Sequence, residues 1–374
     1  MKTLLVTLVL ALYAAPQWVT LYDRTEGLQT NPAELSRAVL NQSIRSNAEA
    51  ALSRTLAPGH RSGENRECGE YDLTDAAADV MAMAIVGHHE EARTRLLEFT
   101  AITLDDRQSG ANQCALDAPT AVRGITEAAW LLESYSGWST ADRSALANWL
   151  TTEVFPLADW AATHRKNNWG AAGLAGAYEI AAYASGGVET LTRADGSSIS
   201  PQSYLEDTSG ADLTAWLSTE TALDSACGDV FGQQPNGSFP DELRRTGGVC
   251  DQPDLSFANG GSAVFYSQKS TNLLARLCES RRRVEGNGAS CFDLVDHGGS
   301  NTRLVDALWF STGFDPLDDN AQGVRHVLGQ YMQDRCILEI PSDGQVFSRG
   351  GRDMPYASIT HADGVAYEST PGPC

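Results

Sequence analysis

The sequence predicts a mainly α-helical protein whose paired helices form an incomplete (α/α) toroid, or barrel. Apolar residues recur at helical spacing over most of the chain, in about nine stretches of helical length. Strands do not alternate with helices, and no GxGxxG sequence follows a strand. Helices in this number must pack around a shared core, and both a toroid and an irregular bundle satisfy that requirement.

Helix start signals and turn residues divide the chain into the predicted helices. Asn31 and Pro32 mark the start of the first helix, because asparagine caps a helix and proline fits its first turn. Thr74 or Asp75 is expected to cap the second. A turn-rich tail with room for short strands follows from residue 337 onward. The predicted helical stretches are residues 31–57, 74–104, 118–137, 139–164, 164–184, 212–227, 261–284, 301–313 and 319–334.

Residues 1–15, MKTLLVTLVLALYAA, are typical of a secretory signal peptide, with one lysine, an apolar run and small residues. The run is short for a membrane-spanning helix, although an uncleaved anchor is the alternative. Residues 25–374 then form a single α/α domain. We expect a secreted or periplasmic monomer.

The eight cysteines contain no CxxC pair, which disfavours a zinc site. An even number behind a signal peptide favours up to four disulfides, with Cys227–Cys250 and Cys278–Cys291 as expected pairs. We expect no metal and no cofactor. The net charge of −21 argues against nucleic acid or an anionic membrane as the main partner, but a local basic groove can still bind a polyanion.

Residues 164–184, HRKNNWGAAGLAGAYEIAAYA, join a strongly polar start to a helix of small residues. A glycine inside a helix costs roughly 1 kcal/mol relative to alanine, so Gly173 and Gly176 indicate a neighbour that packs very close. Asn167 and Asn168 have two interpretations. One amide caps the helix while the other bonds a loop, or one amide points into a cleft and donates to a carboxylate.

A second polar block, PNGSFPDELRRTGG, spans residues 235–248 and precedes a helix that carries Tyr266. The asparagine doublet, this block and the tyrosine-bearing helix, in that order, resemble the alginate lyase family of polysaccharide lyases over residues 118–280. The resemblance implies an α/α toroid that cleaves acidic polysaccharides by β-elimination.

The resemblance also implies roles for particular residues. Asn168 would contact the uronate carboxylate, Arg245 would be the active-site arginine and Tyr266 the catalytic tyrosine. The chain departs from the best-studied members in two ways. Trp169 stands where they have a histidine, and the 21 positions that separate Arg245 from Tyr266 exceed the spacing in those members.

In β-elimination the C5 proton of a uronate is removed and the 4-O-linked sugar leaves. The site must neutralise the carboxylate, a task that suits the Asn168 amide and Arg245. Tyr266, with its pKa lowered by a nearby guanidinium, would take the proton and pass it to the leaving oxygen. If the reaction needs two residues, His164 is the second candidate.

Five residues are candidates for substrate binding: Asn167, Trp169, Lys166, Arg165 and Arg244. Arg165 and Lys166 would hold neighbouring uronates, and the alternative for both is ordinary surface charge. Trp169 is either a platform on which a sugar stacks or part of the core.

Two other functions stay open at this stage. A glycoside hydrolase on the same fold would use two carboxylates, Asp241 or Glu242 with Asp75 or Asp79. A glycan-binding relative of the lyases would hold a uronan without turnover, which the replacement of histidine by Trp169 makes plausible. The sequence names neither the polymer nor endo or exo action.

Overall fold

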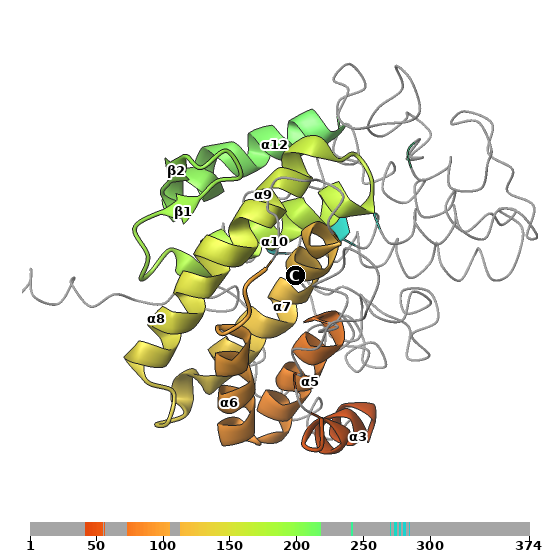
Figure 1. Cartoon of the computed structure of the whole chain (residues 1–374), viewed down its shortest axis with the longest axis vertical. Coiled ribbons are helices and arrows are strands. Elements are labelled where there is room, and N and C mark those ends of the chain that lie inside the picture. The colour runs from red at the N-terminus through yellow and green to blue at the C-terminus, as the bar shows by residue number, and fades with distance from the viewer. Residues whose placement is uncertain are drawn as a thin grey trace, which may run out of the picture.

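The computed structural model describes residues 42–54, 56, 73–104 and 113–217, and residues 241, 270, 273, 274, 277, 280, 281 and 284. These residues are mostly helical (Figure 1), as predicted, whereas closure of the helices into a toroid remains a prediction. Within this part of the chain, no helix has the length and apolar character needed to span a membrane. The helices are α3 (Gln42–Ala51), α5 (Leu73–Val86), α6 (His89–Phe99), α7 (Cys114–Leu131), α8 (Thr140–Trp149), α9 (Phe155–His164), α10 (Asn168–Ala184), α11 (Pro201–Ser203) and α12 (Ser209–Leu217).

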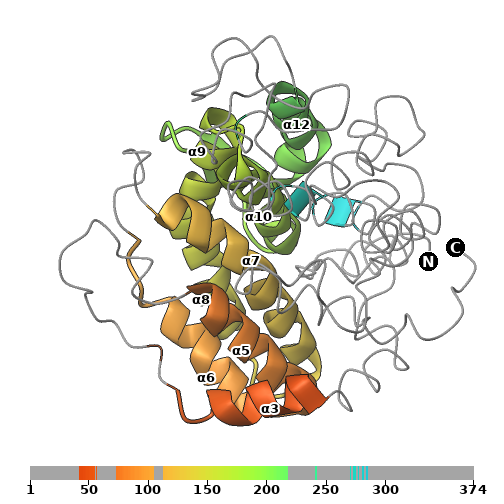
Figure 2. The ribbon, with the colours of Figure 1, turned by 90° about the vertical axis from the view of Figure 1, so that its right-hand side faces the viewer.

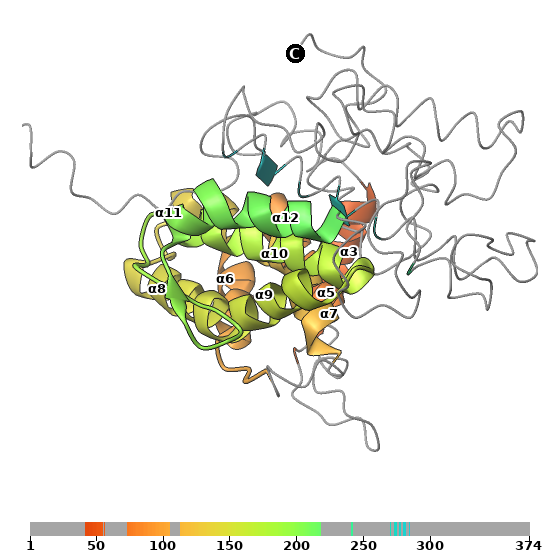
Figure 3. The same ribbon diagram turned by 90° about the horizontal axis from the view of Figure 1, so that it is seen from above.

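The core is built on a row of helices. α3, α5, α7, α10 and α12 each pack against the next, and in Figure 2 they follow one another from the bottom of the view to the top. Nearly every residue of α5, α7 and α10 is buried. α6 packs against α5 and α8, while α9 packs against α7 and α10. Seen from above, α9 and α12 lie on either side of α10 (Figure 3).

Glycines in α10 allow its neighbours to approach closely. A Cβ atom on Gly173 would lie 2.5 Å from the carbonyl oxygen of Ala158 in α9, and one on Gly176 would lie 2.8 Å from Pro119 in α7. Real Cβ atoms do not tolerate such distances to backbone, so a side chain at either position would push two helices apart. The close packing predicted at both glycines is confirmed.

The predicted stretch 74–104 is two helices rather than one. α5 ends at Val86. Gly87 follows with a φ of +94°, and the amide of His88 donates to the carbonyl of Met83 at 2.9 Å. A glycine in the left-handed region followed by this bond is a common helix stop. α5 also begins at Leu73, so Thr74 and Asp75 lie in its first turn and the predicted cap is wrong.

The stretch 139–164 is helical throughout, with one irregular turn. Ser139 caps α8, because its side chain accepts from the amide of Asp142 while the Asp142 carboxylate accepts from the Ser139 amide. A π-helical turn, Leu150–Val154, then joins α8 to α9. Pro156 follows that turn and has no N–H to donate, which explains why the regular hydrogen-bond ladder is interrupted here.

A short hairpin that the sequence analysis did not predict follows α10. β1 (Leu191–Thr192) pairs antiparallel with β2 (Ser198–Ile199), and Gly196 turns the chain between them with a φ of +82°. A second π-helical turn, Tyr204–Thr208, then joins α11 to α12.

Several predictions fall wholly or partly on residues outside the described ranges. The described residues of the predicted helix 261–284 are helical, and those at 270, 273, 274, 277, 280 and 284 are buried at helical spacing. Cys114 forms a disulfide. Other predictions lie entirely outside the described residues. They are the two expected cysteine pairs, the signal peptide at 1–15, the helices at 301–313 and 319–334, and the tail.

Candidate functional site

The candidate site begins at the corner where α9 ends and α10 begins, residues 164–170. Only three residues connect the two helices, so the N-terminus of α10, the positive end of its dipole, lies at this corner. The Asn167 side-chain oxygen accepts a hydrogen bond from the amide of Trp169 at 3.0 Å. Asn167 is therefore the N-cap of α10, as one of the two interpretations proposed.

Asn168 is the first residue of α10 and is fully buried. The same turn is tightly packed, because a Cβ atom on Gly170 would lie 2.4 Å from the indole nitrogen of Trp216 in α12. Buried amides are held by hydrogen bonds, so the orientation of this side chain is fixed by its surroundings.

Lys166 is buried as well, which the sequence analysis did not anticipate. Its Nζ donates to the carbonyl oxygen of Ala215 at 2.8 Å, in the last turn of α12. Burial lowers the pKa of the Lys166 ammonium to about 8. An ammonium at the negative end of a helix dipole stabilises that helix, so Lys166 ties α12 to the start of α10 and is not ordinary surface charge.

Arg165 lies between two indoles. Its Cζ atom is 5.2 Å from the ring centroid of Trp160 in α9 and 5.4 Å from that of Trp169 in α10, within the range of cation–π attraction. All three side chains are half-buried, and both indoles pack against the core. Part of Trp169 therefore belongs to the core, and a role in stacking against a sugar stays a prediction.

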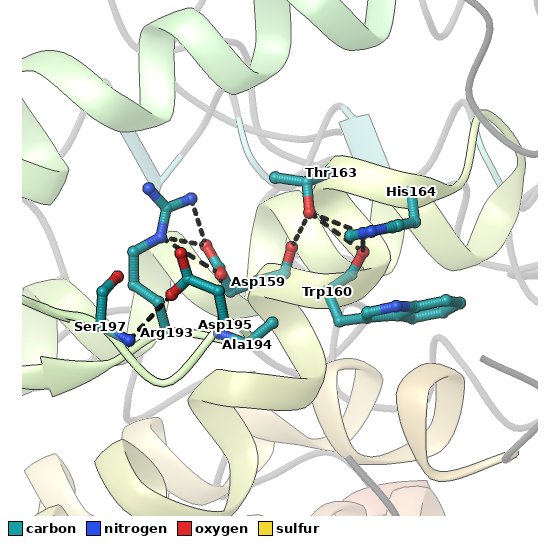
Figure 4. Close-up of polar contacts among 8 residues, drawn as sticks. All are labelled: Asp159, Trp160, Thr163, His164, Arg193, Ala194, Asp195 and Ser197. Atoms are coloured by element: carbon teal, nitrogen blue, oxygen red, sulfur yellow. Dashed lines mark hydrogen bonds and ion pairs between the residues drawn. The ribbon is translucent and has the colours of Figure 1, made fainter. Parts of the chain in front are cut away.

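His164 is exposed at the end of α9, with its ring stacked on that of Trp160 at 5.1 Å and an interplanar angle of 11° (Figure 4). Its Nδ1 lies 3.0 Å from the carbonyl oxygen of Trp160. A carbonyl oxygen can only accept, so Nδ1 carries the hydrogen and Nε2 is left as the acceptor. A role for His164 as a base would use Nε2.

The other predicted catalytic residues, Tyr266 and Arg245, lie outside the described residues, as does Arg244. The described residues include four tyrosines that could replace Tyr266 as the catalytic base. Those at 178, 183 and 204 are buried, and burial raises the pKa of the phenols at 183 and 204, the opposite of what a base requires. Tyr135 donates to Glu90 at 2.8 Å. None of these four is placed to act as the base, and Tyr266 stays the candidate.

Three of the four carboxylates that a hydrolase would use lie among the described residues. Asp79 is buried and pairs with Arg54 at 2.9 Å, which makes it a poor general acid because the guanidinium favours its charged form. Asp75 is half-buried on the same helix, Asp241 is buried, and Glu242 lies outside the described residues. Among the described residues, no group of three or more histidines, cysteines or carboxylates is arranged to hold a metal ion.

A second polar cluster, which the sequence did not indicate, joins α9 to the hairpin. The buried Asp159 accepts from the Arg193 guanidinium at 2.8 Å and from the amide of Ala194 at 3.0 Å, which anchors the hairpin to α9 (Figure 4). Asp212 of α12 faces the same cluster. Its own burial, followed by the charge of Asp159, raises the pKa of the Asp212 carboxyl from 3.8 to about 6, while Arg193 opposes this shift.

Asp212→Asn is expected to stabilise the protein at pH 7 by about 1 kcal/mol, after allowance for solvent screening of this half-buried group. The folded pKa lies above the unfolded one, so the folded chain holds the proton more tightly. The stability contributed by Asp212 is therefore full below pH 4 and is lost as the pH rises through 6. Denaturant titrations of both proteins at pH 4 and pH 7 test this, and an equal difference at the two pH values would contradict it.

No family model and no curated protein matches the chain. Among solved structures, an alginate lyase from Bacteroides ovatus aligns with a TM-score of 0.48 and 13% sequence identity, over 89% of this chain and 92% of that chain.

Proposed function

We propose that the protein is a polysaccharide lyase that cleaves an acidic, uronate-containing polysaccharide by β-elimination and leaves a C4–C5 unsaturated product. It would act as a secreted or periplasmic monomer on an α/α toroid. The observation that carries the proposal is the corner at the start of α10. There the amide of Asn168, the cation of Arg165 and the indole of Trp169 lie beside the positive end of a buried helix, within a sequence that resembles the alginate lyases.

The proposed chemistry assigns one task to each group. The uronate carboxylate is neutralised by the Asn168 amide, by Arg245 and by the positive end of α10, which makes the C5 proton more acidic. Tyr266 removes that proton, the C4–O bond breaks as the C4–C5 double bond forms, and the same proton passes to the leaving oxygen. If the proton donor and acceptor are different groups, His164 Nε2 is the second one.

Ultraviolet absorbance of the protein mixed with a panel of uronans tests the proposal, because the unsaturated product absorbs and the intact polymer does not. We expect a rise with at least one polymer, and its loss in Tyr266→Phe. A Tyr266→Phe variant that stays fully active would refute the tyrosine assignment. New reducing ends without a rise in absorbance would refute elimination and favour the hydrolase.

A glycan-binding protein without turnover is the second candidate. It is favoured by Trp169, which stands in place of the family histidine and has its ring engaged with Arg165. Binding of a uronan without unsaturated product or new reducing ends would support this alternative.

A further inference from the structure

Three charged side chains meet where α9, the hairpin and α12 come together, and their charges do not balance. The carboxylates of Asp159 and Asp212 face a single guanidinium, that of Arg193, so the fully ionised set has an excess of negative charge. We propose that α12 is a pH-sensitive element, which is held firmly against α9 while Asp212 is protonated and loosens once Asp212 is charged. Such a device would operate whether or not the protein is a lyase.

The guanidinium of Arg193 is committed to Asp159. Its Nε and Nη2 atoms donate to the Asp159 carboxylate at 3.1 Å and 2.8 Å, and the amide of Ala194 adds a further bond at 3.0 Å (Figure 4). A planar guanidinium that donates through two of its nitrogens is held in one orientation. Asp159 can therefore keep its charge in a buried position, and little compensation is left for a second carboxylate.

Asp212 is the uncompensated member of the cluster. Its Oδ2 atom is buried and makes no hydrogen bond to any residue that the structure describes. The same holds for the hydroxyl of Tyr204, in the π-helical turn before α12. Burial, followed by the charge of Asp212, raises the pKa of this phenol, so Tyr204 stays neutral. A buried carboxylate oxygen without a donor is costly when charged, so the packed helix favours the protonated form of Asp212.

Other groups near α12 leave this direction unchanged. The first turn of a helix favours a charged carboxylate, but burial and then Asp159 outweigh this effect and raise the pKa of Asp212 to about 6. Arg281 lies near the start of the helix, with its Nη1 atom 3.7 Å from where a Cβ on Gly210 would be. Lys166 bonds the last turn, and its pKa of about 8 places its change of charge at higher pH. Asp212 is thus the member of this set that changes charge between pH 5 and pH 7.5.

The direction of the pKa shift determines when α12 loosens. The pKa of Asp212 is higher when α12 is packed against α9 than when the helix is released, so the bound proton holds the helix in place. This stabilisation is full below pH 4 and is lost as the pH rises through 6. The other end of α12 contacts the start of α10, where Lys166 donates to the carbonyl of Ala215. A change in the packing of α12 therefore reaches the candidate site.

Hydrogen exchange of the full-length protein, followed by mass spectrometry at pH 5 and pH 7.5, tests the proposal. After correction for the intrinsic pH dependence of exchange, residues 204–217 should exchange about fivefold faster at pH 7.5, which allows for solvent screening of Asp212. The hairpin, residues 191–199, and helix α7 should change less than twofold. In Asp212→Asn and Asp212→Ala the response of residues 204–217 should disappear.

Two control variants should keep the wild-type response. Asp207→Asn removes an exposed carboxylate from the turn before α12, and His164→Gln removes the exposed histidine at the end of α9. Circular dichroism at both pH values verifies that each variant is folded. Equal acceleration in residues 204–217 and in α7 would indicate global unfolding and overturn the proposal. An unchanged wild-type chain would overturn it too, as would an Asp212→Asn response as large as that of the wild type.

Discussion

Asn168→Ala is expected to lower kcat on the cleaved polymer by about 10²–10³-fold, the usual effect of removing one donor that stabilises a developing oxyanion. The amide is fixed in place, since Asn168 is fully buried in the first turn of α10. A donor that is already oriented needs no reorganisation as charge moves onto the uronate carboxylate. The measurement is the initial rate of ultraviolet absorbance at saturating substrate.

The same burial means that Asn168→Ala also costs stability, about 1–2 kcal/mol for a buried amide whose hydrogen bonds are lost. The assay must therefore be run where the variant is fully folded. Asn168→Asp separates the two effects, because it keeps the shape but places a carboxylate against the substrate carboxylate, so activity should fall further. Asn148→Ala, an exposed helical position in α8, is the matched control and should retain full activity. An Asn168→Ala enzyme with a wild-type kcat would rule out the donor role.

The residue types within short segments indicated two features of the fold, a helix cap and close contacts between helices. One of the two interpretations of the asparagine doublet placed a cap at the start of α10, and Asn167 provides it. Gly173 and Gly176 stand where alanine would favour the helix more, which predicted close contacts with neighbouring helices. Both contacts are present. Glycine is the usual residue just past a helix end, so Gly87 is a stop signal in the sequence, but the apolar pattern continues beyond it and predicts one long stretch.

Features that depend on tertiary contacts could not be predicted in this way. Lysine is almost never fully buried, so nothing in the sequence indicated that Lys166 would bond the end of α12. Asp159 and Arg193 are 34 positions apart, and their pairing depends on a hairpin that is only two residues long on each side. At the site, the corner residues are neighbours in the sequence and their roles stay predictions, whereas the contact of Trp160 with Arg165 depends on the course of the chain from α9 into α10.

A buried charged network joins the central helices. Arg123 of α7 is fully buried, and its guanidinium lies 3.4 Å from the carboxylate of Glu179 in α10 and 3.5 Å from that of Glu127 one turn later in α7. Arg123 also donates to the hydroxyl of Ser280 at 3.0 Å, and that hydroxyl donates to Glu179 at 3.0 Å. Four side chains from three segments thus share one enclosed polar site.

Arg123→Met is expected to destabilise the fold by about 3–5 kcal/mol, because it leaves buried carboxylates without their cation. Denaturant unfolding followed by circular dichroism measures the loss. Arg143→Ala is the control, because this half-buried arginine pairs with Glu133 in a partly exposed surface pair, and a change under about 1 kcal/mol is expected. Replacing the whole set, as Arg123→Met with Glu127→Leu and Glu179→Leu, should recover much of the stability. A triple variant no more stable than Arg123→Met would mean that lost packing, rather than uncompensated charge, causes the effect. An Arg123→Met protein as stable as the wild type would contradict a stabilising role for this network, and would show that α7 and α10 are held together by their apolar contacts.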